Sequence, residues 1–335
     1  RLASGPQGAI ALPQAMDALW AAYASLFERS GAALVSYAQW IDEVETPGLP
    51  SPAEQEAIAS RWTYRPRFSV VLPVWNTPPE LLRACLDSVQ AQTYPDWELC
   101  IADDASTDPA VHEVLRAYQA RDKRIRVVFR PTNGHIVAAS NTALALASGD
   151  FVVLLDHDDL LAPHALFAVA QALQGRPSAQ ILYSDEDKLD DTGQRCDPYF
   201  KPDWSPDLLY SQNYISHLGV YRRDLVQRVG GFREGFQGSQ DYDLVLRCVA
   251  EVADPHDIVH IPQVLYHWRM TPGSTARGHD QKDYASEAGR RALQDHFDTH
   301  HPGVSVSVVA PGIYRHRWPL PEPAPGGLAA DGADV

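Results

Sequence analysis

Residues 68–75, Phe-Ser-Val-Val-Leu-Pro-Val-Trp, form an almost unbroken apolar run that is followed by the polar pair Asn76-Thr77. Such a run is typical of a strand that is buried on both faces of a sheet. A segment of helical periodicity follows, and the alternation then repeats. We expect further strands at 97–102, 125–130 and 151–155, and helices at 79–92, 109–121 and 136–147. This order predicts βαβ units, and hence an α/β fold with a mostly parallel, Rossmann-like sheet and helices on both faces.

The rest of the chain is less regular. Its patterns predict helices at 162–174 and 240–250, strands at 180–184, 214–221 and 264–270, and a polar, Pro-rich passage at 185–205. We expect these strands to form a smaller antiparallel region. Apolar residues at helical spacing from 13 to 45 predict a helical N-terminal extension, either a cap on the main domain or an interface to another domain. We therefore expect an extension and linker at 1–64, a main domain at 65–310 and a disordered tail at 311–335.

Composition excludes some classes of function. The chain has 28 Lys and Arg residues against 43 Asp and Glu residues, a formal net charge of −15. We expect no nucleic-acid partner, because such binding depends on basic residues that neutralise phosphates. A phosphorylated ligand would then need a divalent cation to hold it. No run of about 18 apolar residues predicts a transmembrane segment, and no signal peptide is apparent, so we expect a cytoplasmic protein. The absence of an initiator Met leaves a longer, multidomain protein open.

Polar residues follow three of the expected strands. They are Trp75-Asn76-Thr77, Asp103-Asp104-Ala105-Ser106 and Asp156-His157-Asp158-Asp159. In a parallel sheet these ends lie along one edge, where ligands bind. Carboxylates two residues apart on a turn can converge on a hard cation such as Mg²⁺ or Mn²⁺. The alternative is an Asp-rich loop that caps the next helix, with Asp159 as the cap.

Other polar groups each have a functional and a structural interpretation. The helix after Asn133-Gly134-His135 could present its N-terminus to a phosphate or ribose, or its alanines could simply pack on the sheet. Asp241 is a candidate general base or a helix cap. His267 and Arg269 could reach a cation and a diphosphate, or be structural. The charged segment 185–188 could bind an acceptor or be an exposed loop.

Several of these motifs together resemble those of family 2 glycosyltransferases. They are FSVVLPVWN from Phe68, LDSVQAQTY from Leu86, ADDASTD from Ala102 and LLDHDD from Leu154, and the likeness extends to about residue 275 through YSDEDKLD from Tyr183, DPYFKPDWSPDLLYSQNYISHLG from Asp197, GSQDYDL from Gly238 and LYHWR from Leu265. The likeness is closest to the bacterial polysaccharide and O-antigen branch, which includes rhamnosyltransferases. Motifs in this order are far more specific than a single DxD.

The resemblance implies a GT-A fold, an inverting mechanism and a Mn²⁺ or Mg²⁺ cofactor. It implies a nucleotide-sugar-binding half at 65–160 and an acceptor and catalytic half at 161–310. The implied catalytic base is Asp241, and the implied metal ligands are Asp158, His267 and Asp156. Donor-binding residues are expected at Pro73, Trp75, Asp103, Asn133, Asn141, Asp156, His157 and Arg269, and acceptor-binding residues at Asp185, Asp187 and Gln240. Ser140 departs from the family, in which many members carry Arg.

The expected reaction moves a sugar from dTDP-rhamnose or a UDP-hexose to a hydroxyl of a glycan acceptor. In the resembling branch this reaction serves surface polysaccharide and O-antigen synthesis, on a lipid-linked acceptor at the inner face of the cytoplasmic membrane. Two alternatives stay open. A nucleotidyltransferase could share the sheet and the metal, although residues 73–79 lack its usual Gly-rich loop. A non-catalytic donor-binding module of a larger synthase would keep the pocket without turnover.

Overall fold

The computed structural model describes residues 35–270 and 282–319, with only the backbone described at 282 and 283. The chain divides into two compact units, residues 1–50 and 51–335. In the first unit, α2 (Tyr37–Trp40) continues into the π-helix η1 (Ile41–Glu45) and then α3 (Thr46–Gly48). The predicted helical extension at 13–34 and the tail at 320–335 lie outside the described residues.

The second unit begins with α4 (Pro52–Ala59), in the region predicted as a linker. The Thr93 hydroxyl donates to Gln55 Oε1 of α4 at 2.5 Å. After the helix, the Trp62 ring stacks on Phe167 at 5.4 Å. This part of the predicted linker is therefore a helix and a following segment, and both contact residues of the main domain.

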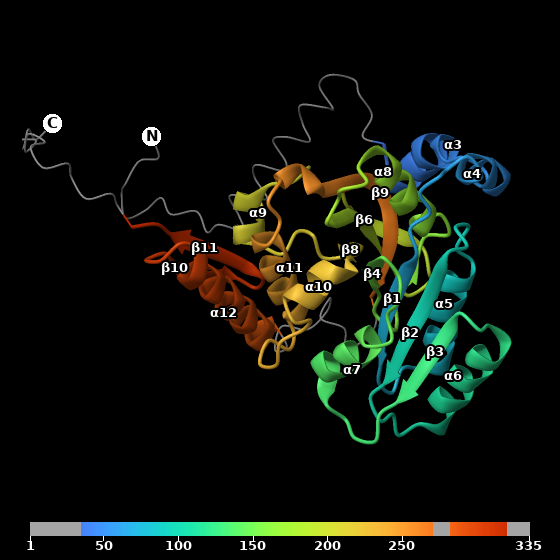
Figure 1. Ribbon diagram of the computed structural model, residues 1–335, viewed down its shortest axis with the longest axis horizontal. Coiled ribbons are helices and arrows are strands. Elements are labelled where there is room, and N and C mark those ends of the chain that lie inside the picture. Colours follow the sequence, from blue (N-terminus) through green and yellow to red (C-terminus); the bar gives the residue numbers. More distant parts are fainter. Residues whose placement is uncertain (1–34, 271–281, 320–335) are drawn as a thin grey trace, which may run out of the picture. The chain divides into compact units, whose positions relative to one another are not determined.

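A nine-stranded sheet is the centre of the second unit within the described ranges (Figure 1). Its first half is parallel in the order β3-β2-β1-β4, with β1 (Phe68–Val74), β2 (Trp97–Asp103), β3 (Ile125–Phe129) and β4 (Phe151–Leu154). The second half follows in the order β8-β6-β9-β5, with β8 (Gly219–Arg222), β6 (Ile181–Leu189), β9 (Ile258–Arg269), β5 (Leu160–Leu161), and β7 (Arg195–Tyr199) beside β6. Strands β8, β7 and β5 are antiparallel to their neighbours, but β6 and β9 are parallel. The mostly parallel α/β sheet is confirmed.

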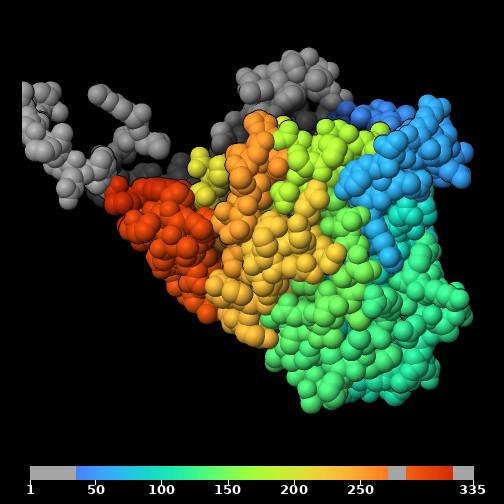
Figure 2. Space-filling view, in the orientation of Figure 1, coloured from blue at the N-terminus to red at the C-terminus, as the bar shows by residue number. Residues whose placement is uncertain are grey.

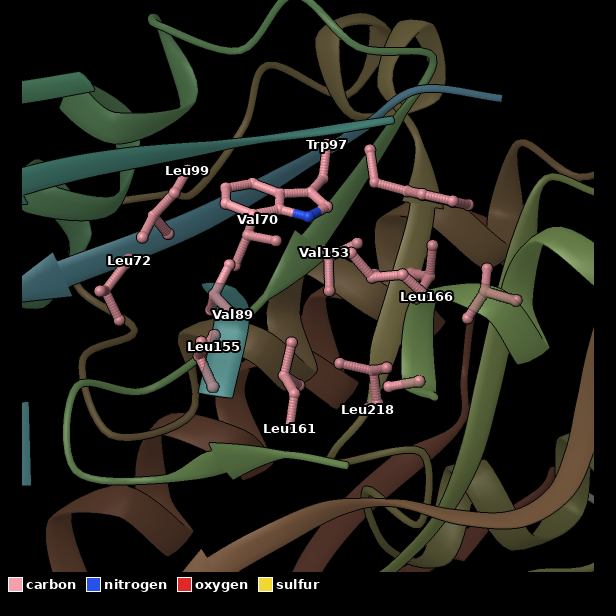
Figure 3. Packing of buried hydrophobic residues seen from close by; sticks show 14 of the residues in the cluster. Val70, Leu72, Val89, Trp97, Leu99, Val153, Leu155, Leu161, Leu166 and Leu218 are labelled. Carbon is pink, nitrogen blue, oxygen red and sulfur yellow. The ribbon is translucent and has the colours of Figure 1, made fainter. Parts of the chain in front are cut away.

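Helices cover both faces of the parallel half. α5 (Pro79–Gln90), α6 (Pro109–Arg121) and α8 (Ala165–Gly175) pack on the face that carries Val70 and Leu72. α7 (His135–Leu144) packs on the other face, where Ala139 and Ala143 meet Val71. Successive strand residues point to opposite faces of the sheet, so Val70 and Val71 pack in different apolar cores. Figure 3 shows the first core, in which Trp97, Val89 and Leu166 lie around the strand residues.

A second apolar core joins the later elements. They are α9 (Pro206–Ser211), α10 (Arg223–Arg228), α11 (Gln240–Ala250), α12 (Lys282–His300), and the hairpin of β10 (Ser305–Ala310) and β11 (Ile313–Arg317). The 3₁₀ helix η2 (Pro255–Asp257) leads into β9 and has no buried residue. Figure 2 shows the residues after 282 in red, packed against the yellow and orange segments that precede them. None of the helices in the described ranges has the length and apolar character needed to cross a bilayer.

Two predictions about irregular segments are wrong. The tail predicted as disordered from Pro311 contains β11, whose Tyr314 is buried and stacks on Tyr242 at 5.7 Å. That aromatic contact gives a Pro- and Gly-rich segment enough apolar burial to order it. The passage 185–205 contains the second half of β6 and all of β7. Its charged residues form a strand because other elements supply ion-pair partners for them.

His296 on α12 is a titratable group in the second core. It is only 7% exposed, and its Nε2 has no hydrogen-bond partner among the described residues. Burial, together with His300 and His301, lowers the pKa of His296 from its usual 6.5 to about 4. The native state therefore holds the ring neutral at a pH where the unfolded chain protonates it.

We expect acid to destabilise the protein through His296. Between pH 6.5 and pH 4 the unfolded state binds more protons, so the free energy of unfolding falls as pH drops, by at most about 3 kcal/mol for the full shift. Urea unfolding at pH 7 and pH 4.5 measures this. The variant His296→Gln should lose part of the pH dependence, whereas the exposed His256→Gln should keep it. Equal pH dependence in the wild type and His296→Gln would contradict the assignment.

Candidate active site

Three polar strand ends meet at the carboxyl edge of the parallel half-sheet. The register pairs Val74 of β1 with Asp103 of β2, and the Asp104 N–H donates to the Val74 carbonyl at 2.8 Å. On the other side of β1, β4 leads directly into the acidic turn 156–159. The sequence prediction that these ends share one edge is therefore confirmed.

Asp103 is completely buried at the end of β2. Its Oδ2 accepts from the Ser106 N–H at 3.2 Å and lies 3.0 Å from His112 Nε2. Its Oδ1 is buried and has no hydrogen-bond partner among the described residues. A buried polar atom without a partner costs roughly 1–3 kcal/mol, which a ligand that donates an N–H would offset. Asp103 thus fits the predicted donor-binding role.

Pro73 and Trp75, the other residues predicted at the donor base, lie at the end of β1. Pro73 is buried within the strand, and Trp75 is 54% exposed. Asn76 ties this end to the next strand end, since its N–H donates to Ser106 Oγ at 2.8 Å and its Oδ1 accepts from the Thr107 N–H at 2.7 Å. The brace leaves the Trp75 ring exposed beside Asp103.

Asn133 and Asn141 brace the loops around α7. Asn133 Nδ2 donates to the Asp104 carbonyl at 3.1 Å, and the Asp104 carboxylate accepts from the Gly134 N–H at 3.0 Å. Both ends of the Asn141 amide engage the backbone of Phe232, at 2.8 and 2.9 Å. Donor contacts from Asn133 and Asn141 stay predictions.

Asp159 does not cap a helix. β5 follows it, and α8 starts only later with its own N-terminal residue. Asp159 is completely buried, where Oδ2 accepts from the Tyr266 hydroxyl at 2.6 Å and Oδ1 accepts from the Arg269 N–H at 2.7 Å. Burial, then the neighbouring Asp158 and Asp156, raises the pKa of Asp159 well above its usual range. The cap prediction is wrong because β9 takes both carboxylate oxygens.

The rest of the acidic turn is more open to ligands. The Asp156 side chain is 43% exposed and the Asp158 side chain 23% exposed. His157 Nδ1 lies 3.8 Å from Asp158 Oδ1. Arg269 Nε donates to the Asp158 carbonyl at 2.9 Å, which holds the guanidinium beside the turn. The turn therefore offers Asp156 and Asp158 outward and uses Asp159 as an anchor.

His217, which the sequence did not single out, also belongs to this group. It lies between α9 and β8, with Nε2 3.9 Å from Asp156 Oδ2. Its ring stacks on Tyr266 at 4.4 Å with an interplanar angle of 11°. Among the described residues, Asp156, Asp159 and His217 each place one potential metal-ligating atom within 4.8 Å of the others. His217 stood inside the motif quoted from Asp197, but nothing local marked it.

His267, the predicted histidine ligand, is paired with Asp187 on the neighbouring strand. The register of β6 and β9 places the two residues opposite each other, and His267 Nδ1 lies 2.5 Å from Asp187 Oδ1. Arg195 Nε donates to the other Asp187 oxygen at 2.5 Å. Asp187 is completely buried. A metal contact from His267 and an acceptor contact from Asp187 stay predictions.

Asp185 is part of the same buried strand. Shifts in register on either side of it place consecutive acidic residues in the interior. Asp185 Oδ1 accepts from the Lys201 N–H at 2.8 Å and lies 2.9 Å from His260 Nε2. The exposed-loop interpretation of 185–188 is therefore wrong, and an acceptor contact from Asp185 stays a prediction.

Asp241 is the second residue of α11 and is linked to the turn through Asn213 and His217. The Asn213 side-chain amide donates to Asp241 Oδ2 at 2.8 Å. Burial raises the pKa of Asp241, while the nearby His217 opposes the rise and Asp156 adds to it. A carboxylate whose pKa is raised towards the operating pH is a stronger proton acceptor, which suits a general base.

The other polar residues around Asp241 have structural partners. Asp243 accepts from Arg233 Nε at 3.0 Å and from Arg247 Nε at 2.9 Å. Gln240 Oε1 accepts from the Gly238 N–H at 2.8 Å. The ion pairs of Asp243 leave Asp241 as the better candidate base, and an acceptor contact from Gln240 stays a prediction.

A buried ion pair fixes the backbone of His217. Lys201 Nζ donates to Glu186 Oε2 at 3.0 Å, to the Ile215 carbonyl at 2.7 Å and to the His217 carbonyl. Glu186 Oε2 also accepts from the His217 N–H at 2.9 Å. Burial lowers the pKa of Lys201, and Glu186 opposes this. We call the pair of Lys201 and Glu186 the clamp.

A surface hollow of about 540 Å³ lies at the opposite, amino-terminal edge of the sheet, and its lining is Arg65, Arg67, Pro95, Asp96, Trp97 and Arg124. Its arginines are ion-paired with Asp96, Glu98 and Asp122. The unpartnered oxygen of Asp103 and the acidic turn, in which the pKa of Asp159 is raised, lie at the carboxyl edge, so we place the site there.

Residues 69–230 match a family model described as Glycosyl transferase family 2. The chain carries a family 2 glycosyltransferase domain. The match includes all three polar strand ends, the acidic turn and His217, and it ends before Asp241.

Two relatives extend the likeness of this glycosyltransferase domain. The protein y4gI of Sinorhizobium fredii is 55% identical over 258 residues, which are 76% of this chain and 28% of that protein. The O-antigen biosynthesis protein RfbC of Myxococcus xanthus is 42% identical over 287 residues, which are 86% of this chain and 22% of that protein. The chain thus spans about a quarter of the length of these relatives.

Two solved structures share the fold of this chain. S. aureus TarS 1-349 in complex with UDP-GlcNAc has a TM-score of 0.56 at 20% identity, over 69% of this chain and 66% of that one. The mannosyltransferase PcManGT of Pyrobaculum calidifontis, in complex with GDP-Man and Mn²⁺, has a TM-score of 0.51 at 22% identity, over 74% and 71%. The expected GT-A fold is confirmed.

We expect loss of the clamp to destabilise the glycosyltransferase domain. Lys201→Met leaves Glu186 buried without its counter-charge and should lower the free energy of unfolding by about 3–5 kcal/mol. Lys188→Met is the matched control, because Lys188 pairs with Asp197 at 3.4 Å on the surface and should contribute less than about 1 kcal/mol. Urea unfolding at pH 7 compares them. Equal losses in the two variants would show that the clamp is energetically unimportant.

Proposed function

We propose that this domain transfers a sugar from a nucleoside diphosphate donor to a hydroxyl of a glycan acceptor, with inversion at the anomeric carbon. One observation carries the proposal. The segment 213–217 contacts Asp241 through Asn213 and approaches Asp156 through His217, so it links a carboxylate of raised pKa to the acidic turn. Asp103 and Trp75 lie at neighbouring strand ends on the same edge.

The donor side is supported by Asp103 and Trp75. The buried Oδ1 of Asp103 can accept the imide N–H of uracil or thymine, and the exposed Trp75 ring offers a face on which a base can stack. We therefore favour a UDP-hexose or dTDP-rhamnose as the donor. TarS and PcManGT were solved with UDP-GlcNAc and GDP-Man, which supports a nucleotide sugar in general.

The cation side is supported by the chemistry of the turn. Asp156 and Asp158 offer carboxylate oxygens that suit Mn²⁺ or Mg²⁺, and His217 and Arg269 stand beside them. A bound cation would supply positive charge that stabilises the departing diphosphate. The Arg269 guanidinium adds charge-assisted hydrogen bonds of the kind that diphosphates accept.

Asp241 performs the proton transfer in this proposal. Asn213 holds Oδ2, and the other carboxylate oxygen takes the proton of the acceptor hydroxyl. The acceptor oxygen forms its bond to the anomeric carbon from the face opposite the nucleotide. The bond between that carbon and the diphosphate oxygen breaks, and its electron pair leaves with the nucleoside diphosphate.

The biological acceptor is proposed from similarity. The identity with RfbC of Myxococcus xanthus, described as an O-antigen biosynthesis protein, favours a growing surface polysaccharide as acceptor. Such a glycan would be lipid-linked at the inner face of the cytoplasmic membrane. A panel of nucleotide sugars, with and without Mn²⁺, tests the proposal: release of nucleoside diphosphate supports sugar transfer, pyrophosphate release indicates a nucleotidyltransferase, and donor binding without turnover indicates a non-catalytic module.

We expect Asp241→Asn to remove the base and keep the shape. Turnover should fall about 10²–10⁴-fold, while the donor Kd changes little. In the wild type, turnover should decline as pH falls through the pKa of Asp241, which lies above its ordinary value. Stopped assays measure the turnover and calorimetry the donor Kd, and Asp224→Asn is the control because the Asp224 side chain on α10 is exposed. Wild-type turnover in Asp241→Asn would refute the assignment.

Asp103→Asn should weaken donor binding without changing the catalytic base. The Asn side chain lacks the charge that strengthens a hydrogen bond from the base, so the Kd for UDP should rise about 10- to 100-fold. Asp108→Asn is the matched control, because Asp108 caps α6 near the same edge and Asn caps helices equally well. Titration of UDP by calorimetry measures both. An unchanged Kd in Asp103→Asn would remove Asp103 from the donor site.

A further inference from the structure

We propose that His217 is a direct ligand of the divalent cation and gives the site a preference for Mn²⁺ over Mg²⁺. This inference rests on the proposed function, which requires a cation at the acidic turn. It differs from the expectation that His267 provides the imidazole ligand. Two features of the site support it: the donor atoms that are open around Asp156, and the contacts that hold the His217 ring.

The open donor atoms next to Asp156 include the His217 ring nitrogen. Asp156, Asp159 and His217 form the potential metal group among the described residues. Asp159 already accepts hydrogen bonds with both oxygens, from Tyr266 and from Arg269. Ligation by Asp159 would break contacts to β9, whereas His217 Nε2, 3.9 Å from Asp156 Oδ2, needs only a small movement to share an ion with it.

The His217 ring is held in place by contacts within the protein itself. Tyr266 covers one face at 4.4 Å, and the Trp268 ring packs edge-on at 5.9 Å. Lys201 and Glu186 fix the carbonyl and the N–H of the same residue. A ligand held by packing and by supporting hydrogen bonds loses little entropy on binding, which is how such supporting contacts strengthen metal sites.

His267 is held differently. Its Nδ1 pairs with Asp187, which is itself paired with Arg195, and both His267 and Asp187 belong to the β6–β9 ladder. None of the described contacts joins His267 to Asp156, whereas His217 Nε2 lies 3.9 Å from Asp156 Oδ2. The geometry therefore favours His217 as the nitrogen donor.

The proposed ligand set carries a consequence for metal choice. Mg²⁺ strongly prefers oxygen ligands in octahedral geometry, whereas imidazole nitrogen suits transition metals better. A site of Asp156, Asp158 and His217 should therefore bind Mn²⁺ more tightly than Mg²⁺. If His217 were replaced by an oxygen ligand, binding should persist and this preference should shrink.

Mn²⁺ titration followed by electron paramagnetic resonance, in the presence of UDP, tests the proposal on the whole chain without an activity assay. His217→Gln should lose on the order of tenfold or more in Mn²⁺ affinity, since even supporting contacts of metal ligands contribute 10- to 100-fold. His217→Asp should recover binding with a smaller ratio of Mn²⁺ to Mg²⁺ affinity. His260→Gln is the control, because His260 also stacks on a tyrosine and pairs with an aspartate, but lies away from the turn.

A spectroscopic signature separates a ligand from a structural role. Pulsed electron paramagnetic resonance of bound Mn²⁺ should show coupling to an imidazole nitrogen in the wild type and in His260→Gln, and none in His217→Gln. No nitrogen coupling in the wild type, or coupling that persists in His217→Gln, overturns the proposal. Nitrogen coupling in a protein that transfers no sugar from any donor would support the metal site while refuting the proposed function. Sugar transfer without nitrogen coupling would support the proposed function while refuting His217 as a metal ligand.

Discussion

The hydrogen bonds that Asp159 accepts from Tyr266 and Arg269 hold the acidic turn against β9. The same two residues of β9 also contact the backbone of the turn, since Arg269 Nε donates to the Asp158 carbonyl and the Asp156 N–H donates to the Tyr266 hydroxyl, and the two residues of β5 pair with β9 beyond it. The same Tyr266 supplies the face on which His217 stacks. One buried carboxylate thus fixes the position of Asp156 and Asp158 on one side and, through a shared tyrosine, of His217 on the other.

The second half of the sheet uses buried ion pairs where the first half uses apolar packing. Asp185, Glu186 and Asp187 are consecutive buried acids on β6, and each has a basic or histidine partner. Buried pairs of this kind add little net stability, because desolvation offsets most of the attraction. They do specify geometry, since an alternative register would leave charges buried without partners. The charged part of β6 is therefore held in its register by the need to satisfy charge.

This contrast explains how much the sequence could predict. The parallel half follows from local patterns that are visible within short windows. The strand expected at 68–75 is observed at 68–74, and the helix expected at 79–92 is observed at 79–90, so both end within two residues of the expected positions. β6 was predicted to end at Ser184, because its acidic residues find partners such as Lys201 and His260 only in the folded chain. Local sequence patterns show apolar periodicity, but they do not show which charged residues, far apart in the chain, will pair in the folded protein.

The residues of the candidate site also fall into two groups: those that local sequence patterns predict and those that only the folded chain brings together. Asp103 and the acidic turn follow directly after apolar strands, so the sequence alone predicts that they lie at the edge of a sheet. His217 and Asn213 lie in an irregular segment, and their roles arise from contacts with residues 61 and 28 positions away in the chain, Asp156 and Asp241. Family motifs marked Asp241 without indicating what holds it.

The two halves of the sheet also differ in the chemical roles that we propose for them. If Asp103 and Trp75 hold the donor nucleotide, as we propose, the donor can bind independently of the acceptor, because neither residue contacts Asp241 among the described residues. The proposed catalytic base, Asp241, is instead coupled to the acidic turn through residues 213–217, because Asn213 donates to Asp241 and His217 approaches Asp156. A shift of that segment would move the proton acceptor and the turn's imidazole together. Asp103 should therefore affect donor affinity without affecting the proton acceptor, whereas the clamp should affect both the cation site and the proton acceptor through the backbone of His217.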